Sequence, residues 1–135
     1  MKPDFSYRAI PLRVLDGDTI QVKLTLWLNL TLETTVRLHG INTPEVRGPT
    51  QDKGLVSAKA LALKLDLDYP TKEKGQGKPV TLKVLGIEKY GRTLGKLFLG
   101  DLDLGDWLVK EGLAVPYMAD REILPEDPFL SQEEP

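Results

Sequence analysis

The stretch of residues 37–45, RLHGINTPE, carries the side chains of this sequence best suited to phosphate chemistry. Its first residue, Arg37, has a guanidinium that can bind a phosphate through two hydrogen bonds. Its last residue, Glu45, has a carboxylate that can hold a metal ion or take a proton from water. Apolar alternation through residues 32–40 predicts a strand, and Pro44 marks the loop that follows it. The alternative is a surface strand end with a solvated Arg and Glu.

The residue composition limits which metal sites this chain can build. It contains no Cys and one His, which excludes thiolate ligands and a site of several histidines. His39 is therefore expected to be structural or solvent-facing. Any metal must be held by oxygen ligands, which indicates Ca²⁺ or Mg²⁺.

Charge is unevenly distributed along the 135 residues, a length that fits one domain with a real core. The net charge is −2, but the stretch from Asp120 onward holds one basic and six acidic residues, which leaves the rest at +3. We expect a domain over residues 1–118 and an acidic, extended or disordered tail over 119–135. A mildly basic body is compatible with a polyanionic partner without demanding one. There is no apolar run of membrane-spanning length, and the first ten residues lack an apolar signal core.

Hydrophobic periodicity predicts a small barrel with helices. Residues 50–66 change to helical spacing, a second short helix is expected at 104–111, and Gly112 is a suitable residue to end it. Three strands, a helix, two strands and a helix follow the order of a five-stranded OB-fold barrel. The expected strands are residues 5–15, 20–30, 32–40, 80–88 and 93–99.

The second expected strand has the clearest alternation, and it places two groups of side chains on opposite faces. Trp27 lies on the polar face, where we expect it to pack against a loop, with stacking on a base as the alternative. Trp107 near the last helix is expected in the core. The buried face is expected to hold Ile20, Val22, Leu24, Leu26 and Leu28.

Three motifs stand in order at the predicted strand-to-turn junctions: DGDT at 16–19, RLHGINTPE at 37–45 and EKYGR at 88–92. Together with the ending GLA at 112–114 they resemble the staphylococcal nuclease (thermonuclease) family over roughly residues 8–117. This resemblance implies an OB-fold nuclease that uses one Ca²⁺, hydrolyses phosphodiester bonds in DNA and RNA, and leaves 3′-phosphate ends.

The resemblance also implies a role for each matching position. Arg37 and Arg92 match the arginines that grip the phosphate, and Glu45 matches the glutamate that activates or positions the attacking water. Two arginines and a divalent cation would stabilise the negative charge of the transition state. The metal would be held by Asp18, Asn42 and the backbone carbonyl of Thr43, with Asp16 nearby. The expected substrate-binding residues are Lys89, Tyr90 and Tyr117.

Three positions depart from the family's pattern. Asn42 stands where an aspartate is usual, which removes one anionic metal ligand and is expected to weaken Ca²⁺ binding. Glu88 replaces a common aspartate, and Gly105 replaces an asparagine. We expect retained activity in a monomeric enzyme that has no membrane partner. The alternative is a catalytically weak or inactive module of the same fold that binds nucleic acid or a protein.

Overall fold

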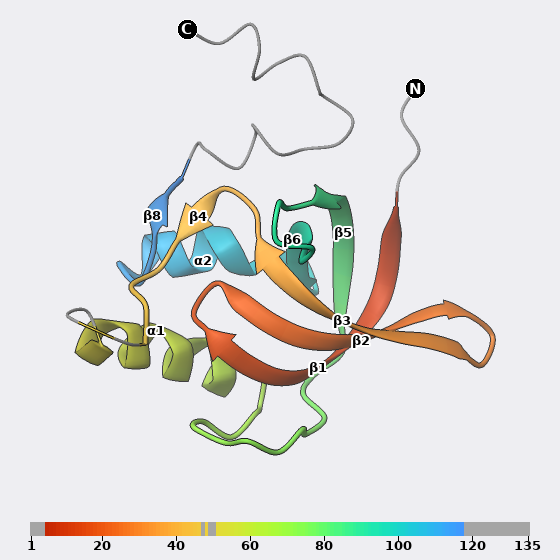
Figure 1. The fold of residues 1–135 in the computed structure, drawn as a ribbon, viewed down its shortest axis with the longest axis horizontal. Coiled ribbons are helices and arrows are strands. Elements are labelled where there is room, and N and C mark those ends of the chain that lie inside the picture. The colour runs from red at the N-terminus through yellow and green to blue at the C-terminus, as the bar shows by residue number, and fades with distance from the viewer. Residues whose placement is uncertain (1–4, 47, 49–50, 118–135) are drawn as a thin grey trace, which may run out of the picture.

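Five long strands close into a barrel in this computed structural model, which describes residues 5–46, 48 and 51–117. They pair in the order β3–β2–β1–β5–β6, and a parallel pairing of β3 with β6 closes the ring (Figure 1). The predicted OB-type barrel is confirmed. The strands are β1 (Ser6–Asp16), β2 (Thr19–Trp27), β3 (Leu30–Leu38), β5 (Val80–Ile87) and β6 (Thr93–Leu99).

Two helices and three two-residue strands complete the described fold. Helix α1 (Gln51–Lys64) packs against β1, and α2 (Leu104–Lys110) packs against β6 and β7. The side chain of Asp103 accepts hydrogen bonds from two backbone N–H groups in the first turn of α2, and Gly112 follows that helix with φ +74°. No helix among the described residues has the length and apolarity that crossing a membrane requires. The short strands, which periodicity did not predict, are β4 (Ile41–Asn42), β7 (Leu102–Asp103) and β8 (Val115–Pro116).

The core fills the barrel and extends under α1. Ile20, Val22 and Leu24 of β2 are buried as the alternation predicted. Burial of side chains of this size contributes roughly 1.5–3 kcal/mol each. Trp107 is only partly buried, packs against this core, and has its ring 5.0 Å from the Lys64 Nζ.

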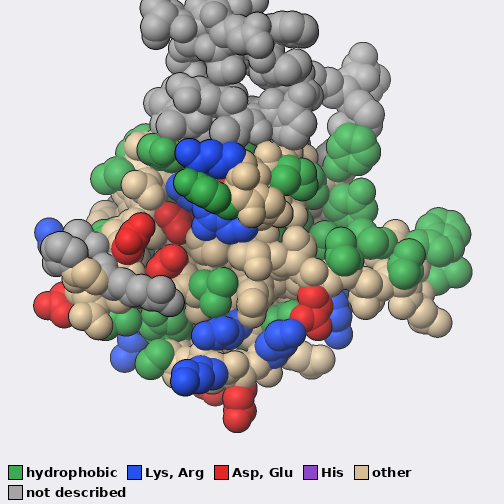
Figure 2. Space-filling model, in the orientation of Figure 1, with side chains coloured by type: hydrophobic (Ala, Val, Ile, Leu, Met, Phe, Trp, Pro, Cys, Tyr) green, Lys and Arg blue, Asp and Glu red, His purple; other side chains and the backbone are tan. Residues whose placement is uncertain are grey.

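The tip of the β2–β3 hairpin corrects three predictions. Leu26 and Leu28 are 37% and 79% exposed, and Trp27 is 71% exposed rather than packed against a loop. The β1 pairing stops at Thr25, so the hairpin runs past the barrel on the side away from α1 (Figure 1). Hydrophobic side chains therefore cover this projection in Figure 2, far from the strand ends that carry the predicted site.

Candidate active site

One pocket of about 240 Å³ at the barrel rim is lined by all ten side chains that the sequence assigns to the site. It lies where the start of β2, the end of β3, the segment around β4 and the β5–β6 turn meet. Thr19 and Glu88 line it as well. The role of each side chain stays a prediction. The ten are Asp16, Asp18, Arg37, Asn42, Thr43, Glu45, Lys89, Tyr90, Arg92 and Tyr117.

Asp18 is fixed at the turn between β1 and β2 with only 7% of its surface exposed. Its Oδ1 accepts a hydrogen bond from the Thr19 hydroxyl at 3.0 Å, and its Oδ2 accepts one from the Thr43 N–H at 3.0 Å. Gly17 permits this close approach, because a Cβ there would lie 3.0 Å from Thr43 Cγ2. The carboxylate therefore ties the turn to the loop after β4.

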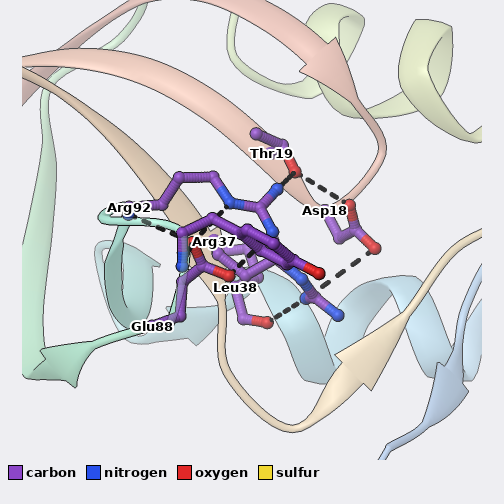
Figure 3. A network of polar contacts seen from close by, with 7 residues as sticks. Asp18, Thr19, Arg37, Leu38, Glu88 and Arg92 are labelled. Carbon is purple, nitrogen blue, oxygen red and sulfur yellow. Dashed lines mark hydrogen bonds and ion pairs between the residues drawn. The ribbon is translucent and has the colours of Figure 1, made fainter. Parts of the chain in front are cut away.

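Arg37 reaches the pocket from the end of β3 and is 7% exposed. Its Nη1 donates to the Leu38 carbonyl at 2.6 Å and lies 3.7 Å from Asp18 Oδ2 (Figure 3). The guanidinium carbon lies 5.8 Å from the centre of the Tyr117 ring. These contacts hold the guanidinium beside the Asp18 carboxylate in the wall of the pocket.

Arg92 is held by a carboxylate that sequence reasoning treated only as a departure from a family pattern. Its Nε and Nη2 donate to Glu88 Oε1 and Oε2 at 3.0 and 2.9 Å (Figure 3). The N–H groups of Tyr90 and Arg92 also donate to Oε1. Gly91, with φ +89°, turns the chain so that the two side chains face each other. The signal available in the sequence was the i, i+4 spacing of Glu and Arg across a glycine turn.

The ion pair between Glu88 and Arg92 shifts the pKa of both groups. The hydrogen bond from Arg92 lowers the pKa of Glu88, against a smaller effect of burial that raises it. The same bond raises the pKa of Arg92, with burial acting in the opposite direction. Both groups are therefore charged at neutral pH, and the guanidinium keeps a fixed orientation at the pocket.

The loop that carries Glu45 is positioned by α1. A Cβ added at Gly54 would lie 2.1 Å from the Glu45 carbonyl oxygen, so helix and loop backbones are in contact there. The Val46 N–H donates to Asp16 Oδ1 at 3.4 Å. Glu45 itself is exposed and lines the pocket.

The small β4–β8 sheet brings the end of the described chain to the site. Asn42 pairs with Val115, and the Tyr117 N–H donates to the Gly40 carbonyl at 2.8 Å. This sheet places Tyr117 over Arg37. The Tyr90 ring, which also lines the pocket and is 74% exposed, has the Lys89 Nζ 5.2 Å from its centre.

The family model described as staphylococcal nuclease homologue matches residues 35–134, well over half of the chain. The chain belongs to the staphylococcal nuclease family. Two proteins named "Uncharacterized endonuclease", from Escherichia coli O157:H7 and from Escherichia coli, are 31% identical to it over 106 residues. That alignment covers 78% of this chain and 58% of each relative, so the chain spans under three fifths of their length.

The family is generally calcium-dependent, and the oxygen atoms of this pocket fit such an ion by type. Thr43 Oγ1 is buried without a hydrogen-bond partner among the described residues, next to the Asp18 carboxylate. Within those same residues, no three Asp, Glu or His side chains gather closely enough to hold a metal by themselves. A cation would therefore also need amide, carbonyl and water oxygens, the ligands that Ca²⁺ accepts. In this staphylococcal nuclease homologue, Asn42 supplies an exposed amide to the lining of the same pocket.

Proposed function

We propose that this domain is a calcium-dependent nuclease that hydrolyses phosphodiester bonds in DNA, RNA or both and leaves 3′-phosphate ends. The observation that carries the proposal is the meeting of two arginines and several carboxylates in one small pocket. Family membership and the name of the relatives support the nuclease activity.

The residues divide the chemistry among them. Arg37 and Arg92 bind the non-bridging phosphate oxygens and stabilise the charge that grows on them in the transition state. Glu45 accepts the proton of the attacking water. The new bond joins the water oxygen to phosphorus while the bond to the 5′ oxygen breaks. The leaving 5′ oxygen takes a proton from solvent water, which gives a 3′-phosphate and a 5′-hydroxyl.

The formal charge of the pocket supports a cation requirement. Four carboxylates line it against three cationic side chains, so its formal charge is −1 before a phosphodiester arrives. A further anion would be repelled unless positive charge is added. Ca²⁺ held by Asp18, Asp16, Asn42 and Thr43 would supply that charge to the phosphate. The cationic and anionic lining residues are Arg37, Lys89, Arg92, Asp16, Asp18, Glu45 and Glu88.

A calcium-titrated digestion of end-labelled single-stranded DNA and RNA tests the proposal. We expect activity that chelation of Ca²⁺ abolishes, and products whose ends lose phosphate on treatment with a phosphatase. Glu45→Gln should lower kcat by about 10²–10⁴-fold, the range for loss of a general base. Arg37→Ala should lower kcat/KM, and Glu33→Gln is the matched control because its carboxylate is exposed and lies outside the pocket.

A second candidate is a binding module without catalysis, which the neutral Asn42 amide favours. It predicts that an oligonucleotide or a protein binds without Ca²⁺, and that Glu45→Gln leaves this binding unchanged. Absence of DNA and RNA cleavage at millimolar Ca²⁺, combined with calcium-independent binding, would replace the nuclease proposal with this one.

A further inference from the structure

A second pocket of about 530 Å³ opens beside the candidate active site. It shares four lining residues with the first pocket, so the two are neighbours. Its own walls come from the last residues of β1 and from residues 69–71 after α1. A space of this size is within the usual range for a small-molecule site. The shared residues are Asp16, Thr19, Glu45 and Arg92.

Arg13 gives this pocket a cation of its own. Its Nε donates to the Thr71 carbonyl at 2.8 Å, which fixes the side chain along the wall. The two terminal nitrogens make no hydrogen bond or ion pair with the described residues, so they are available to a ligand. A guanidinium held by its stem with its end open suits a phosphate oxygen.

Tyr69 and Pro70 give the pocket an apolar wall. The Tyr69 ring is half-buried and packs against the hydrophobic core, which holds it in place. Burial raises the pKa of its hydroxyl, and the nearby Asp16 carboxylate adds to this while Arg13 opposes it. An aromatic ring with a proline beside it offers a face on which a sugar or base can pack.

We infer that this second pocket binds the nucleotide next to the scissile phosphate, with Arg13 on its phosphate and Tyr69 on its sugar or base. The lining residues indicate on which side of the first pocket this nucleotide would lie. Lys89, Tyr90 and Tyr117 line only the first pocket, so the second pocket continues from Arg92 and Glu45 on the other side. The inference rests on the proposed nuclease function, because it assigns a longer piece of the same substrate.

Binding measurements in a Glu45→Gln background test the subsite without turnover. The ligands are a labelled single-stranded octanucleotide and, as its competitor, a dinucleoside monophosphate that carries only the central phosphate. We expect Arg13→Ala to weaken octanucleotide binding about tenfold at low salt and to leave the dinucleoside monophosphate within about twofold. The slope of log affinity against log salt should fall by about 0.7 for one lost phosphate contact on a single strand.

Four variants make the result specific. Arg13→Lys should keep the salt slope, since it keeps the charge, and Arg8→Ala is the matched control on an exposed part of the same strand. Tyr69→Phe should bind like the parent protein. Tyr69→Ala should weaken binding of the octanucleotide and of the dinucleoside monophosphate alike by about five- to tenfold, because both carry the sugar and base next to the central phosphate. If Tyr69→Ala fails to fold, Arg13→Ala still decides the question.

Equal losses on both ligands from Arg13→Ala, or no loss on either, would overturn the subsite. Failure of the proposed function would look different: the protein with Glu45 intact would bind the octanucleotide and not cleave it. In that case the Arg13 measurements still decide whether the second pocket holds a nucleotide.

Discussion

Replacement of Glu88 by glutamine tests whether this buried carboxylate holds Arg92 in position. Glu88 is 5% exposed, and its two oxygens accept four hydrogen bonds, two of them from the Arg92 side chain. Glutamine keeps one acceptor and turns the other into a donor that faces Nη2. A hydrogen bond to a charged group contributes about 1.5–3 kcal/mol. Because Arg92 is one-third exposed and partly screened, we expect a loss of about 2 kcal/mol of unfolding free energy.

Urea denaturation at pH 7 measures this loss. With a slope of about 1–3 kcal/mol per molar urea, the midpoint should fall by about 1 M without a change in slope. Glu33→Gln is the matched control, since its ion pair with Lys74 is about half exposed and should contribute under about 0.5 kcal/mol. Equal midpoints for Glu88→Gln and Glu33→Gln would refute the reasoning.

The pH profile of the same variant supplies a second check. The folded-state pKa of Glu88 lies below its ordinary value near 4.5, with the Arg92 hydrogen bond as the main cause. Its stabilising effect is therefore complete above the unfolded pKa and is lost as pH falls through the folded pKa. The stability difference between the parent and Glu88→Gln should shrink below about pH 4.5. A difference that is constant from pH 7 to pH 3 would contradict this.

Three further substitutions test the calcium requirement and the stability of the fold. Asn42→Asp should lower the Ca²⁺ concentration at half-maximal cleavage about fivefold, because one added charge contributes about 1 kcal/mol at an exposed position. The same half-maximal Ca²⁺ concentration in both proteins would count against the Asn42 amide as a ligand. Gly54→Ala should destabilise by about 2–3 kcal/mol in urea, because its Cβ would meet the Glu45 carbonyl, whereas helix propensity alone predicts a gain of about 1 kcal/mol. Leu28→Asn should raise stability by about 0.5–1 kcal/mol in the same assay, because Leu28 is exposed with φ +47°, where Asn is better tolerated; a loss would show that the Leu side chain makes a stabilising contact.

The barrel was predictable because period-two alternation marks each strand and helical spacing marks α1. The pairing of β1 with β2 is irregular between Pro11 and Arg13. Alternation could not show where the barrel ends. Leu26 and Leu28 continue the pattern of β2, yet they lie beyond the last residue that β1 pairs. Whether Leu26 and Leu28 are buried depends on how far β1 extends beside β2. The pattern within β2 carries no information about that.

The candidate site was predictable where motifs concentrate chemistry within a few residues, as from Arg37 to Glu45. Two of its features have no such signal. Strands β4 and β8 are two residues each, too short for any periodicity, and only their pairing brings Tyr117 over Arg37. The second pocket joins Arg13 to Tyr69, which lie 56 positions apart on either side of α1, so only the folded chain places them together.

Charge shows why a folded site carries information that the whole chain does not. The sequence gives a body of +3 outside the acidic stretch, which agrees with a polyanionic partner and says nothing about a cation. Seven charged side chains line the pocket, and their formal charges sum to −1, opposite in sign to the charge of the body. Under the proposed nuclease function, a phosphodiester would enter such a pocket more favourably with added positive charge. Substitutions that alter the charge of the pocket should therefore shift the calcium requirement, and equal changes elsewhere on the barrel should not.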